Sequence, residues 1–205
     1  MNDMVLKWLF DRIVSAFALI ALAWLLLVIA VAIKVKMGSP VLFVQNRVGR
    51  NGQLFRIHKF RTMELHHDGS SVSVAGESRI TPLGSFLRKY KLDELPELWD
   101  VMIGRMSFVG PRPDVPGYAD KLQGDDRNVL KLSPGITGPA TLKYRDEETL
   151  LASQSNPQQY NDEVIFPDKV RLNLYYYHHH SFMMDLKILF ATVFHQHIIY
   201  DGELI

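Results

Sequence analysis

The sequence predicts a mixed, irregular α/β fold in two parts: a membrane-inserted helical anchor over residues 1–36 and one small domain over residues 37–205. The anchor is indicated by a stretch between Arg12 and Lys34 that contains no charged residue. The domain is indicated by the rest of the chain, where short apolar runs alternate with Gly- and Pro-containing turns. With 205 residues, of which 47% are hydrophobic and 22% charged, the chain can bury one core, and a disordered chain is excluded.

The composition also excludes several functions. The chain has no Cys, which removes disulfides, cysteine zinc sites and thiol catalysis, and is compatible with a reducing compartment. The 23 Lys and Arg are almost balanced by 22 Asp and Glu, so the net charge of +1 gives no reason to expect a nucleic-acid partner.

The apolar segment has the length of a membrane element. Residues 13–33 would form a helix of about 31 Å, which matches a hydrocarbon core of roughly 30 Å. Ser15 is its only polar side chain, so it lacks the polar stripe of a soluble core helix. A cleaved signal peptide fits less well, because its apolar region is usually only about 7–15 residues long and the segment that follows here is strongly basic.

The charges around this segment place its C-terminal side in the cytoplasm. From Lys34 to Arg61 there are seven basic residues and no acidic one. The N-terminal flank, with Lys7 and Arg12, is mildly basic as well. A re-entrant hairpin and a straight span with a very short external tail therefore both remain open on charge alone.

The first elements of the domain are expected to be a hairpin and two helices. Residues 41–44 and 54–57 indicate strands around the turn 50–52, where Asn-Gly suits a tight hairpin. Residues 64–78 form a polar loop that could act as a lid. A helix is predicted to begin at 81–84. Another ends near Gly104, with one apolar face made of Leu95, Leu98, Trp99 and Met102.

The second half of the domain is punctuated by prolines. Residues 109–116 exclude regular helix, and residues 133–139 are expected to form a rigid loop. A last helix is predicted over 182–199, preceded by three tyrosines and three histidines. It could be an amphipathic helix in the lipid headgroup region or an ordinary core helix. The histidines at 178–180 are interpreted as interface residues, because consecutive positions cannot converge on one metal from a single helix face.

Asp93 and Glu94 are the leading candidates for chemistry. They stand just before Pro96, a residue that suits the first turn of a helix. Neighbouring side chains on a helix point about 100° apart, so the two carboxylates would take different roles: one attacking or binding metal, the other orienting. Taken alone, such a pair can equally be a solvated face or a partner of the helix dipole.

Several cations could bind phosphate. Arg112 lies between two prolines, which restrict its backbone in advance, although a surface turn would look the same. Lys59 and Arg61 would share one face of a strand, where attraction to lipid headgroups is the alternative. Arg88 and Arg145 complete the set. No P-loop or dinucleotide fingerprint is present, and the combination suits phosphoryl chemistry with a divalent metal.

Five stretches in fixed order resemble the bacterial sugar transferase family, the small monotopic polyprenyl-phosphate phosphoglycosyl transferases. The resemblance covers the chain from about Lys7 to its C-terminus. It rests on these stretches: Lys59-Phe60-Arg61-Thr62-Met63; Arg79-Ile80-Thr81 with Gly84 and Leu87-Arg88; Leu92-Asp93-Glu94-Leu95-Pro96; Gly104-Arg105-Met106-Ser107-Phe108-Val109-Gly110-Pro111-Arg112-Pro113; and Pro134-Gly135-Ile136-Thr137-Gly138.

The resemblance implies a reaction. A UDP-sugar would give its sugar-1-phosphate to undecaprenyl phosphate and release UMP, in two steps through a covalent intermediate, with Mg²⁺ as cofactor. Asp93 would be the nucleophile and would also touch the metal, with Glu94 as its partner. Phosphates would be bound by Arg112 and by Lys59, Arg88 and Arg145.

The resemblance also implies a place and a pathway class. The enzyme would sit in the bacterial inner membrane with its catalytic domain on the cytoplasmic face, and would carry out the first membrane step of glycoconjugate assembly. Membrane lipid would be a partner, and self-association is left open. The alternatives are a glycosyltransferase that releases UDP and a catalytically silent scaffold of a glycan-assembly complex.

The membrane segment departs from the family pattern at one point. Members commonly carry a Ser-Pro pair that kinks this helix into a re-entrant hairpin, and Ala23-Trp24 stands at the aligned positions. Proline is the commonest cause of a sharp kink, so its absence weakens the expectation of a hairpin. The two basic flanks and the amphipathic last helix still favour anchoring in one leaflet.

Overall fold

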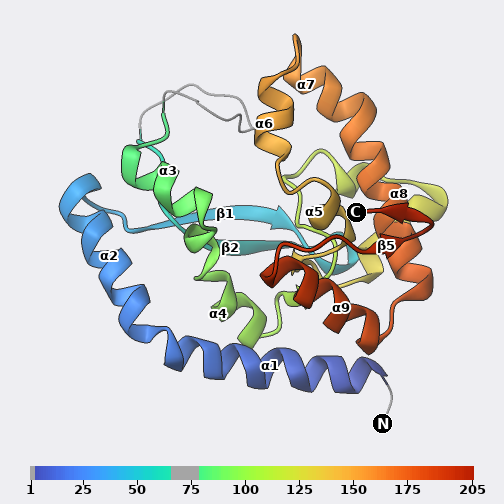
Figure 1. Cartoon of the computed structure of the whole chain (residues 1–205), viewed down its shortest axis with the longest axis horizontal. Coiled ribbons are helices and arrows are strands. Elements are labelled where there is room, and N and C mark those ends of the chain that lie inside the picture. The colour runs from blue at the N-terminus through green and yellow to red at the C-terminus, as the bar shows by residue number, and fades with distance from the viewer. Residues whose placement is uncertain (1–2, 66–78) are drawn as a thin grey trace.

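The computed structural model describes residues 3–65 and 79–205, and shows a small mixed domain bordered by a long bent helix pair (Figure 1). The lid predicted over 64–78 lies, beyond Leu65, outside the described residues. The helices are α1 Asp3–Ala21, α2 Ala23–Met37, α3 Pro82–Lys89, α4 Glu97–Met102, α5 Pro139–Lys143, α6 Glu147–Ala152, α7 Pro157–Tyr160, α8 Phe166–His179 and α9 Phe182–Val193. The strands are β1 Leu42–Val48, β2 Leu54–Phe60, β3 Ser107–Val109, β4 Gly135–Thr137, β5 Ile199–Tyr200 and β6 Glu203–Leu204.

The apolar N-terminal segment is bent rather than straight. Helices α1 and α2 meet at Leu22 with a bend of 62°. By length and hydropathy, no single helix among the described residues could cross a membrane, and only this bent pair meets those criteria together. The bend is formed without proline, because each half packs on a different part of the domain. Helix α1 lies along α4 and α9, while Ile29 and Ile33 of α2 join a core cluster with Phe60 and Leu87 (Figure 1).

The hairpin predicted around Asn-Gly is confirmed. Strands β1 and β2 pair antiparallel from Leu42 opposite Phe60 to Val48 opposite Leu54. Both strands are longer than the apolar runs from which they were predicted. Asn51 and Gly52 adopt φ values of 59° and 75°, the left-handed region that these two residue types tolerate best.

The predictions around the helix and loops of the middle segment need two corrections. Trp99 does not share a buried face with Leu98, because it is 49% exposed, whereas Asp100 is fully buried beside the backbone of β2. Part of the loop predicted over 133–139 is a strand, since β4 pairs parallel with β3. This pairing needs glycine, because a Cβ on Gly135 would lie 2.2 Å from the amide nitrogen of Gly110.

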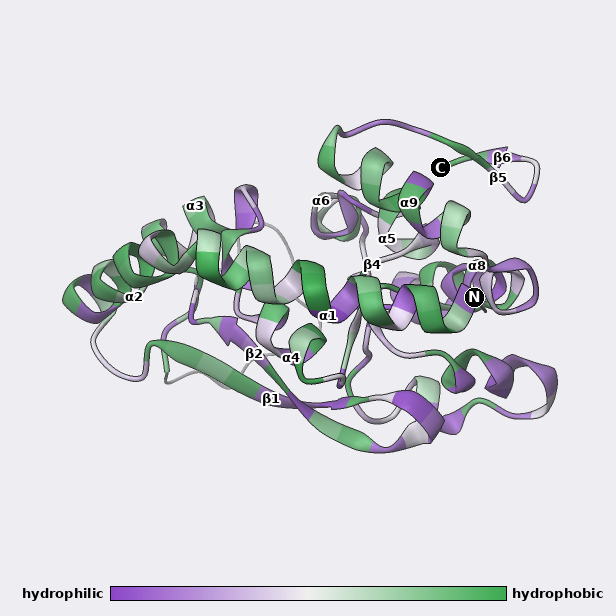
Figure 2. Cartoon of the chain, turned by 90° about the horizontal axis from the view of Figure 1, so that it is seen from below, coloured by the Kyte–Doolittle hydropathy of each residue, from purple (hydrophilic) through white to green (hydrophobic). Residues whose placement is uncertain are grey.

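The last helix is shorter than predicted and has two apolar faces. It ends at Val193, and the chain then forms the β5–β6 hairpin. Ile188 and Ala191 of α9 lie in the main core cluster, whereas Phe190 and Phe194 are more than half exposed. The core-helix interpretation is therefore confirmed for one face. The other face exposes large apolar side chains, as α1 and α2 do, and hydrophobic residues colour much of all three helices (Figure 2).

Candidate active site

Asp93 and Glu94 lie side by side in a buried turn. The 3₁₀ turn Leu92–Glu94 follows α3 and is entered through Lys91, whose φ of 54° reverses the chain direction. The two carboxylates are 7% and 9% exposed. This turn precedes α4, so the pair sits just before the helix that Pro96 begins, and the side chains have different surroundings.

Glu94 is held between two cations. Its Oε1 lies 2.8 Å from Nζ of Lys59 and also accepts a hydrogen bond from Nη2 of Arg112, while Nη1 of Arg112 lies 3.5 Å from Oε2. Burial alone would raise the pKa of Glu94, but the charges of Arg112 and Lys59 outweigh burial and hold that pKa well below its ordinary value. Glu94 is therefore a fixed anion that orients both cations.

Asp93 is placed differently. Its Oδ1 is buried and has no hydrogen-bond partner among the described residues. Burial, and after it the negative charge of Glu94, raise its pKa, against the opposing charges of Lys59, Arg88 and Lys91. A buried oxygen without a partner is costly in a folded protein, so this atom is available to a ligand.

Glu97 joins this cluster, although sequence reasoning did not single it out. It is 1% exposed, and its Oε1 lies 3.1 Å from Nζ of Lys59, so two carboxylates share one ammonium group. Burial raises the pKa of Glu97 to about 7. The feature of the sequence that could have identified Glu97 is its position three residues after Glu94, which places both side chains on the same side of a helical turn.

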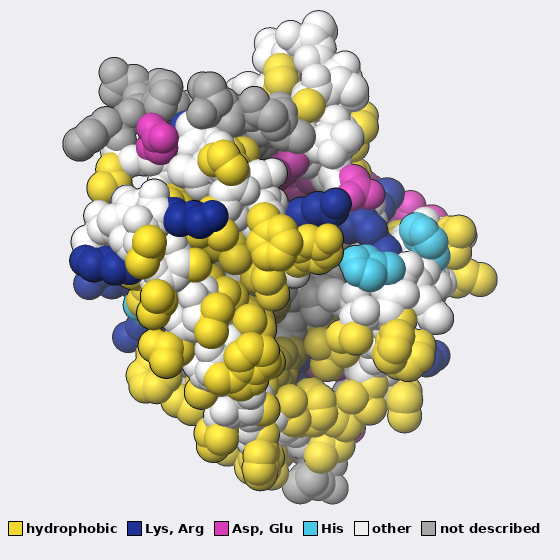
Figure 3. Space-filling view, turned by 60° about the vertical axis from the view of Figure 1, so that its left-hand side comes forward, with side chains coloured by type: hydrophobic (Ala, Val, Ile, Leu, Met, Phe, Trp, Pro, Cys, Tyr) yellow, Lys and Arg dark blue, Asp and Glu magenta, His cyan; other side chains and the backbone are white. Residues whose placement is uncertain are grey.

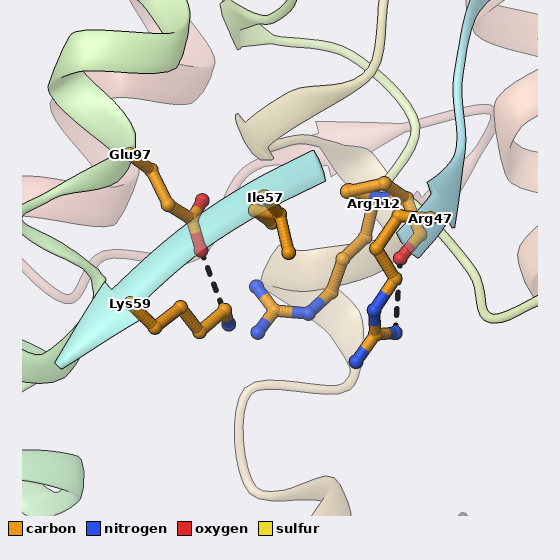
Figure 4. Close-up of a pocket in the computed structure, with 6 residues that line it drawn as sticks. Arg47, Ile57, Lys59, Glu97 and Arg112 are labelled. Atoms are coloured by element: carbon orange, nitrogen blue, oxygen red, sulfur yellow. Dashed lines mark hydrogen bonds and ion pairs between the residues drawn. The ribbon is translucent and has the colours of Figure 1, made fainter. Parts of the chain in front are cut away.

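A small pocket opens beside this cluster, lined by Arg47, Ile57, Lys59, Glu97, Arg112 and Pro113 (Figure 4). The two guanidinium groups lie next to each other, and the ammonium group of Lys59 points toward Arg112. Burial, and then the charge of Arg112, lower the pKa of Arg47, which donates to the carbonyl of Pro113 at 3.2 Å. Three cations around one pocket form a site suited to a multiply charged anion. Arg47 was missed because nothing distinguishes it locally in the sequence.

Arg88 lies at the edge of the cluster. It donates from Nη1 to Glu148 at 3.0 Å and from Nε to the hydroxyl of Thr62 at 3.2 Å. Its charge also lowers the pKa of Asp93, so the structure brings Arg88 near the acidic pair, although it does not line the pocket.

Arg145 and Arg61 are not part of the pocket. Arg145 donates to the carbonyls of Leu142 and Gln196 at 3.2 and 2.9 Å. The prediction that Arg61 shares a strand face with Lys59 is wrong, since β2 ends at Phe60. The buried guanidinium of Arg61 instead donates to the carbonyls that end α2, with 2.9 Å to that of Gly38.

The donor set fits Mg²⁺ bound with substrate. Among the residues described, no three carboxylate or histidine side chains converge as a metal cage. Mg²⁺, however, is usually held by one or two carboxylates together with substrate phosphates and water. Asp93 offers one carboxylate oxygen without a hydrogen-bond partner, and the adjacent Glu94 is paired with Lys59 and Arg112, two cations that line the pocket.

Comparison with known proteins shows the family of the chain. The family model described as bacterial sugar transferase matches residues 2–197. Over 94% of its length the chain is 36% identical to the UDP-glucose:undecaprenyl-phosphate glucose-1-phosphate transferase of Klebsiella pneumoniae, of which it spans 40%. It is 34% identical to the uncharacterized sugar transferase EpsL of Bacillus subtilis and to the exopolysaccharide production protein PSS of Rhizobium leguminosarum, and spans 86% and 94% of them. The chain belongs to the bacterial sugar transferase family.

Proposed function

We propose that this chain is a phosphoglycosyl transferase, which moves sugar-1-phosphate from a UDP-sugar to undecaprenyl phosphate and releases UMP. The proposal is supported by relatives from Klebsiella pneumoniae and Aeromonas hydrophila, whose names specify transfer of glucose-1-phosphate and of N-acetylgalactosamine phosphate to this lipid. It is supported equally by the pocket, whose cations suit a diphosphate. The reaction would be the first membrane step in the assembly of a bacterial glycoconjugate.

The different surroundings of Asp93 and Glu94 are the observation on which their proposed roles rest. Glu94 is tied to Lys59 and Arg112, whereas Oδ1 of Asp93 has no partner. Asp93 is therefore the nucleophile. Its carboxylate oxygen attacks the phosphorus that bears the sugar, the bond from that phosphorus to the bridging oxygen breaks, and UMP leaves with the electron pair. An oxygen of undecaprenyl phosphate then attacks the same phosphorus and releases the Asp93 carboxylate.

The cations around the pocket make this attack feasible. A carboxylate and a diphosphate repel each other, so Lys59, Arg47 and Arg112 must neutralise the phosphate oxygens. Asp93 would hold Mg²⁺ together with those oxygens. When bound, the metal would supply further positive charge where the leaving group becomes negative. Arg88 would add positive potential on the side of Asp93.

The apolar surface supports attachment to a membrane, which we take to be the inner membrane, with the domain on its cytoplasmic face. Hydrophobic side chains cover a broad part of one face of the molecule, and Lys and Arg lie along its border (Figure 3). Phe17, Ile20 and Trp24 of the bent pair are 66–75% exposed. Exposed apolar side chains that gather on one face mark an interaction surface, and lipid would cover this one.

The contacts of α1 support a re-entrant insertion. Lys7, which precedes the apolar segment, lies 2.6 Å from Asp185 of the domain that follows it. Both flanks of the segment are therefore on the same side of any membrane that the bent pair enters. Since the natural chain has no Cys, an Asp3→Cys variant offers one labelling site. We expect an impermeant maleimide to label it in inverted membrane vesicles and not in intact spheroplasts; the reverse result contradicts the hairpin.

The test of the reaction is nucleotide release by the detergent-solubilised protein. UDP-glucose, UDP-N-acetylgalactosamine and other UDP-sugars are supplied with Mg²⁺, with and without undecaprenyl phosphate. The proposal predicts UMP from at least one donor, loss of that release in Asp93→Asn with an unchanged melting temperature, and full activity in the control Asp126→Asn, which changes an exposed carboxylate. Release of UDP favours direct sugar transfer, and no product with any donor favours a silent scaffold.

A further inference from the structure

Helix α1 carries a polar stripe on the side that faces the domain. Lys7, Asp11 and Ser15 follow one another at four-residue intervals, which places them on one helix face. Asp11 is 2% exposed and Ser15 is fully buried, whereas Phe17 and Ile20 on the outer side are 70% and 75% exposed. The helix thus directs its polar side chains inward and its apolar side chains outward, the opposite of a helix on a soluble protein.

The polar stripe contacts the backbone of β3. Oδ1 of Asp11 accepts a hydrogen bond from the amide of Phe108 at 3.3 Å. Nζ of Lys7 donates to the carbonyl of Val109 at 2.9 Å. Since β4 pairs with β3 on its other edge, these two side chains cover the edge that faces α1, where a further strand would otherwise pair.

Lys7 is itself fixed from a second direction. Its ammonium group lies 2.6 Å from Oδ2 of Asp185 in α9, and the other oxygen of Asp185 accepts a hydrogen bond from the hydroxyl of Tyr176. Asp185 and Tyr176 are 3% and 1% exposed. A buried and charge-assisted network of this kind resists displacement, because any broken contact leaves a charge without a partner.

Strand β3 leads directly to the arginine of the pocket. Val109 is followed by Gly110 and Pro111, and Arg112 comes next. The amide of Gly110 donates to the carbonyl of Thr137 at 2.9 Å, and the carbonyl of Pro111 accepts from the amide of Gly135 at 2.8 Å, so the backbone between the strand and Arg112 has little freedom. A shift of β3 would therefore displace Arg112 relative to Glu94.

We infer that Lys7 and Asp11 are positioning residues: from the membrane-facing helix they hold β3, and thereby hold Arg112 in register with Glu94 and the phosphate pocket. This inference rests on the proposed function only where it interprets Arg112 as a phosphate ligand. Through Val109 and Phe108, the position of α1 against the domain would then determine the position of Arg112 in the site.

The first test uses Lys7→Met, which keeps the length of the side chain and removes its donors. Lys7→Arg keeps the charge, and Lys36→Gln is the matched control, since Lys36 is an exposed cation at the other end of the bent pair. UDP with Mg²⁺ is the probe, measured by calorimetry on the full chain in detergent. We expect Lys7→Met to bind UDP about tenfold more weakly, in keeping with the loss of one charge-assisted contact. We expect Lys7→Arg and Lys36→Gln to bind within a factor of two.

A double-mutant cycle separates positioning from a general loss of structure. If Lys7 acts through Arg112, Lys7→Met adds less than a factor of two to the loss in Kd already caused by Arg112→Gln. Amide hydrogen exchange should increase in the peptide that covers residues 107–112 and stay unchanged in the peptide that covers β1. Independent, multiplicative effects of the two substitutions, or exchange that increases equally throughout the chain, would overturn the inference.

Failure of this inference can be distinguished from failure of the proposed function. If the natural chain does not bind UDP, the donor class is wrong, and the same cycle is then measured on the free energy of unfolding, which needs no ligand. Coupling between Lys7→Met and Arg112→Gln would still support the inference, and strict additivity would refute it.

Discussion

Replacing Glu97 by Gln tests the electrostatics of the acidic cluster. Glu97 is 1% exposed and shares the ammonium group of Lys59 with Glu94. Glutamine has almost the same shape, and its carbonyl oxygen can still accept from Lys59. The substitution therefore removes one buried negative charge and little else, so we expect the variant to be more stable than the natural chain above neutral pH.

The direction of this pH dependence of stability follows from the number of protons that the folded and unfolded states bind. Burial raises the pKa of Glu97 from 4.5 in the unfolded chain to about 7 in the folded one. Between these values the folded state binds more protons than the unfolded state, so stability falls as the pH rises from 4.5 toward 7. For Glu97 alone, this loss is on the order of 2 to 3 kcal/mol between pH 5 and pH 8. Glu94 has the opposite effect, which is present in both proteins and cancels to first order in their difference.

The assay is unfolding of both proteins in detergent at pH 5 and pH 8, followed by circular dichroism. We expect the stability of Glu97→Gln relative to the natural chain to increase by on the order of 2 to 3 kcal/mol between the two pH values. Glu163→Gln, at an exposed glutamate, is the control and should show no such increase. An equal difference at both pH values, or a variant that becomes relatively less stable as the pH rises, would refute the assignment of a buried, charge-strained Glu97.

Two further substitutions test contacts that support the site. Arg61→Met should lower the unfolding free energy by about 1–3 kcal/mol, because the carbonyls of Met37 and Gly38 lose their donor at the end of α2; chemical unfolding measures the loss. Gly110→Ala should cost about 3 kcal/mol or more, because the new Cβ would lie 2.2 Å from the carbonyl oxygen of Ser133. A melting temperature equal to that of the natural chain in either variant would contradict the corresponding contact.

Local signals in the sequence were sufficient for the elements that depend on neighbouring residues. The hairpin follows from Asn51-Gly52, and α3 begins where Thr81 accepts from the amide of Gly84 and Pro82 occupies the first turn. The Asp93-Glu94 pair could likewise be selected as a candidate site, because two adjacent carboxylates stand just before a proline. Each of these inferences uses residues within a few positions of one another.

The other features depend on contacts between distant residues, which one sequence does not reveal. Lys59 and Glu94 are 35 positions apart, and Arg47 and the carbonyl of Pro113 are 66 apart. No periodicity distinguishes Arg47, which lines the pocket, from Arg145, which does not. The bend at Leu22 was also beyond local reasoning, because it arises from packing of α1 and α2 on separate parts of the domain and not from a residue that breaks a helix.

Two charges that flank the apolar segment have partners in the structure that the sequence does not reveal. Counted along the chain, Lys7 and Arg12 make the N-terminal flank basic and leave its orientation undecided. In the structure, Lys7 is neutralised by Asp185, and Arg12 lies 3.6 Å from Asp11. The positive-inside rule counts Lys and Arg near the segment rather than net charge, so both flanks still count as basic. The larger number of basic residues lies after Lys34, and charge alone agrees with either topology. The ion pair between Lys7 and Asp185 is the contact that supports the proposed hairpin.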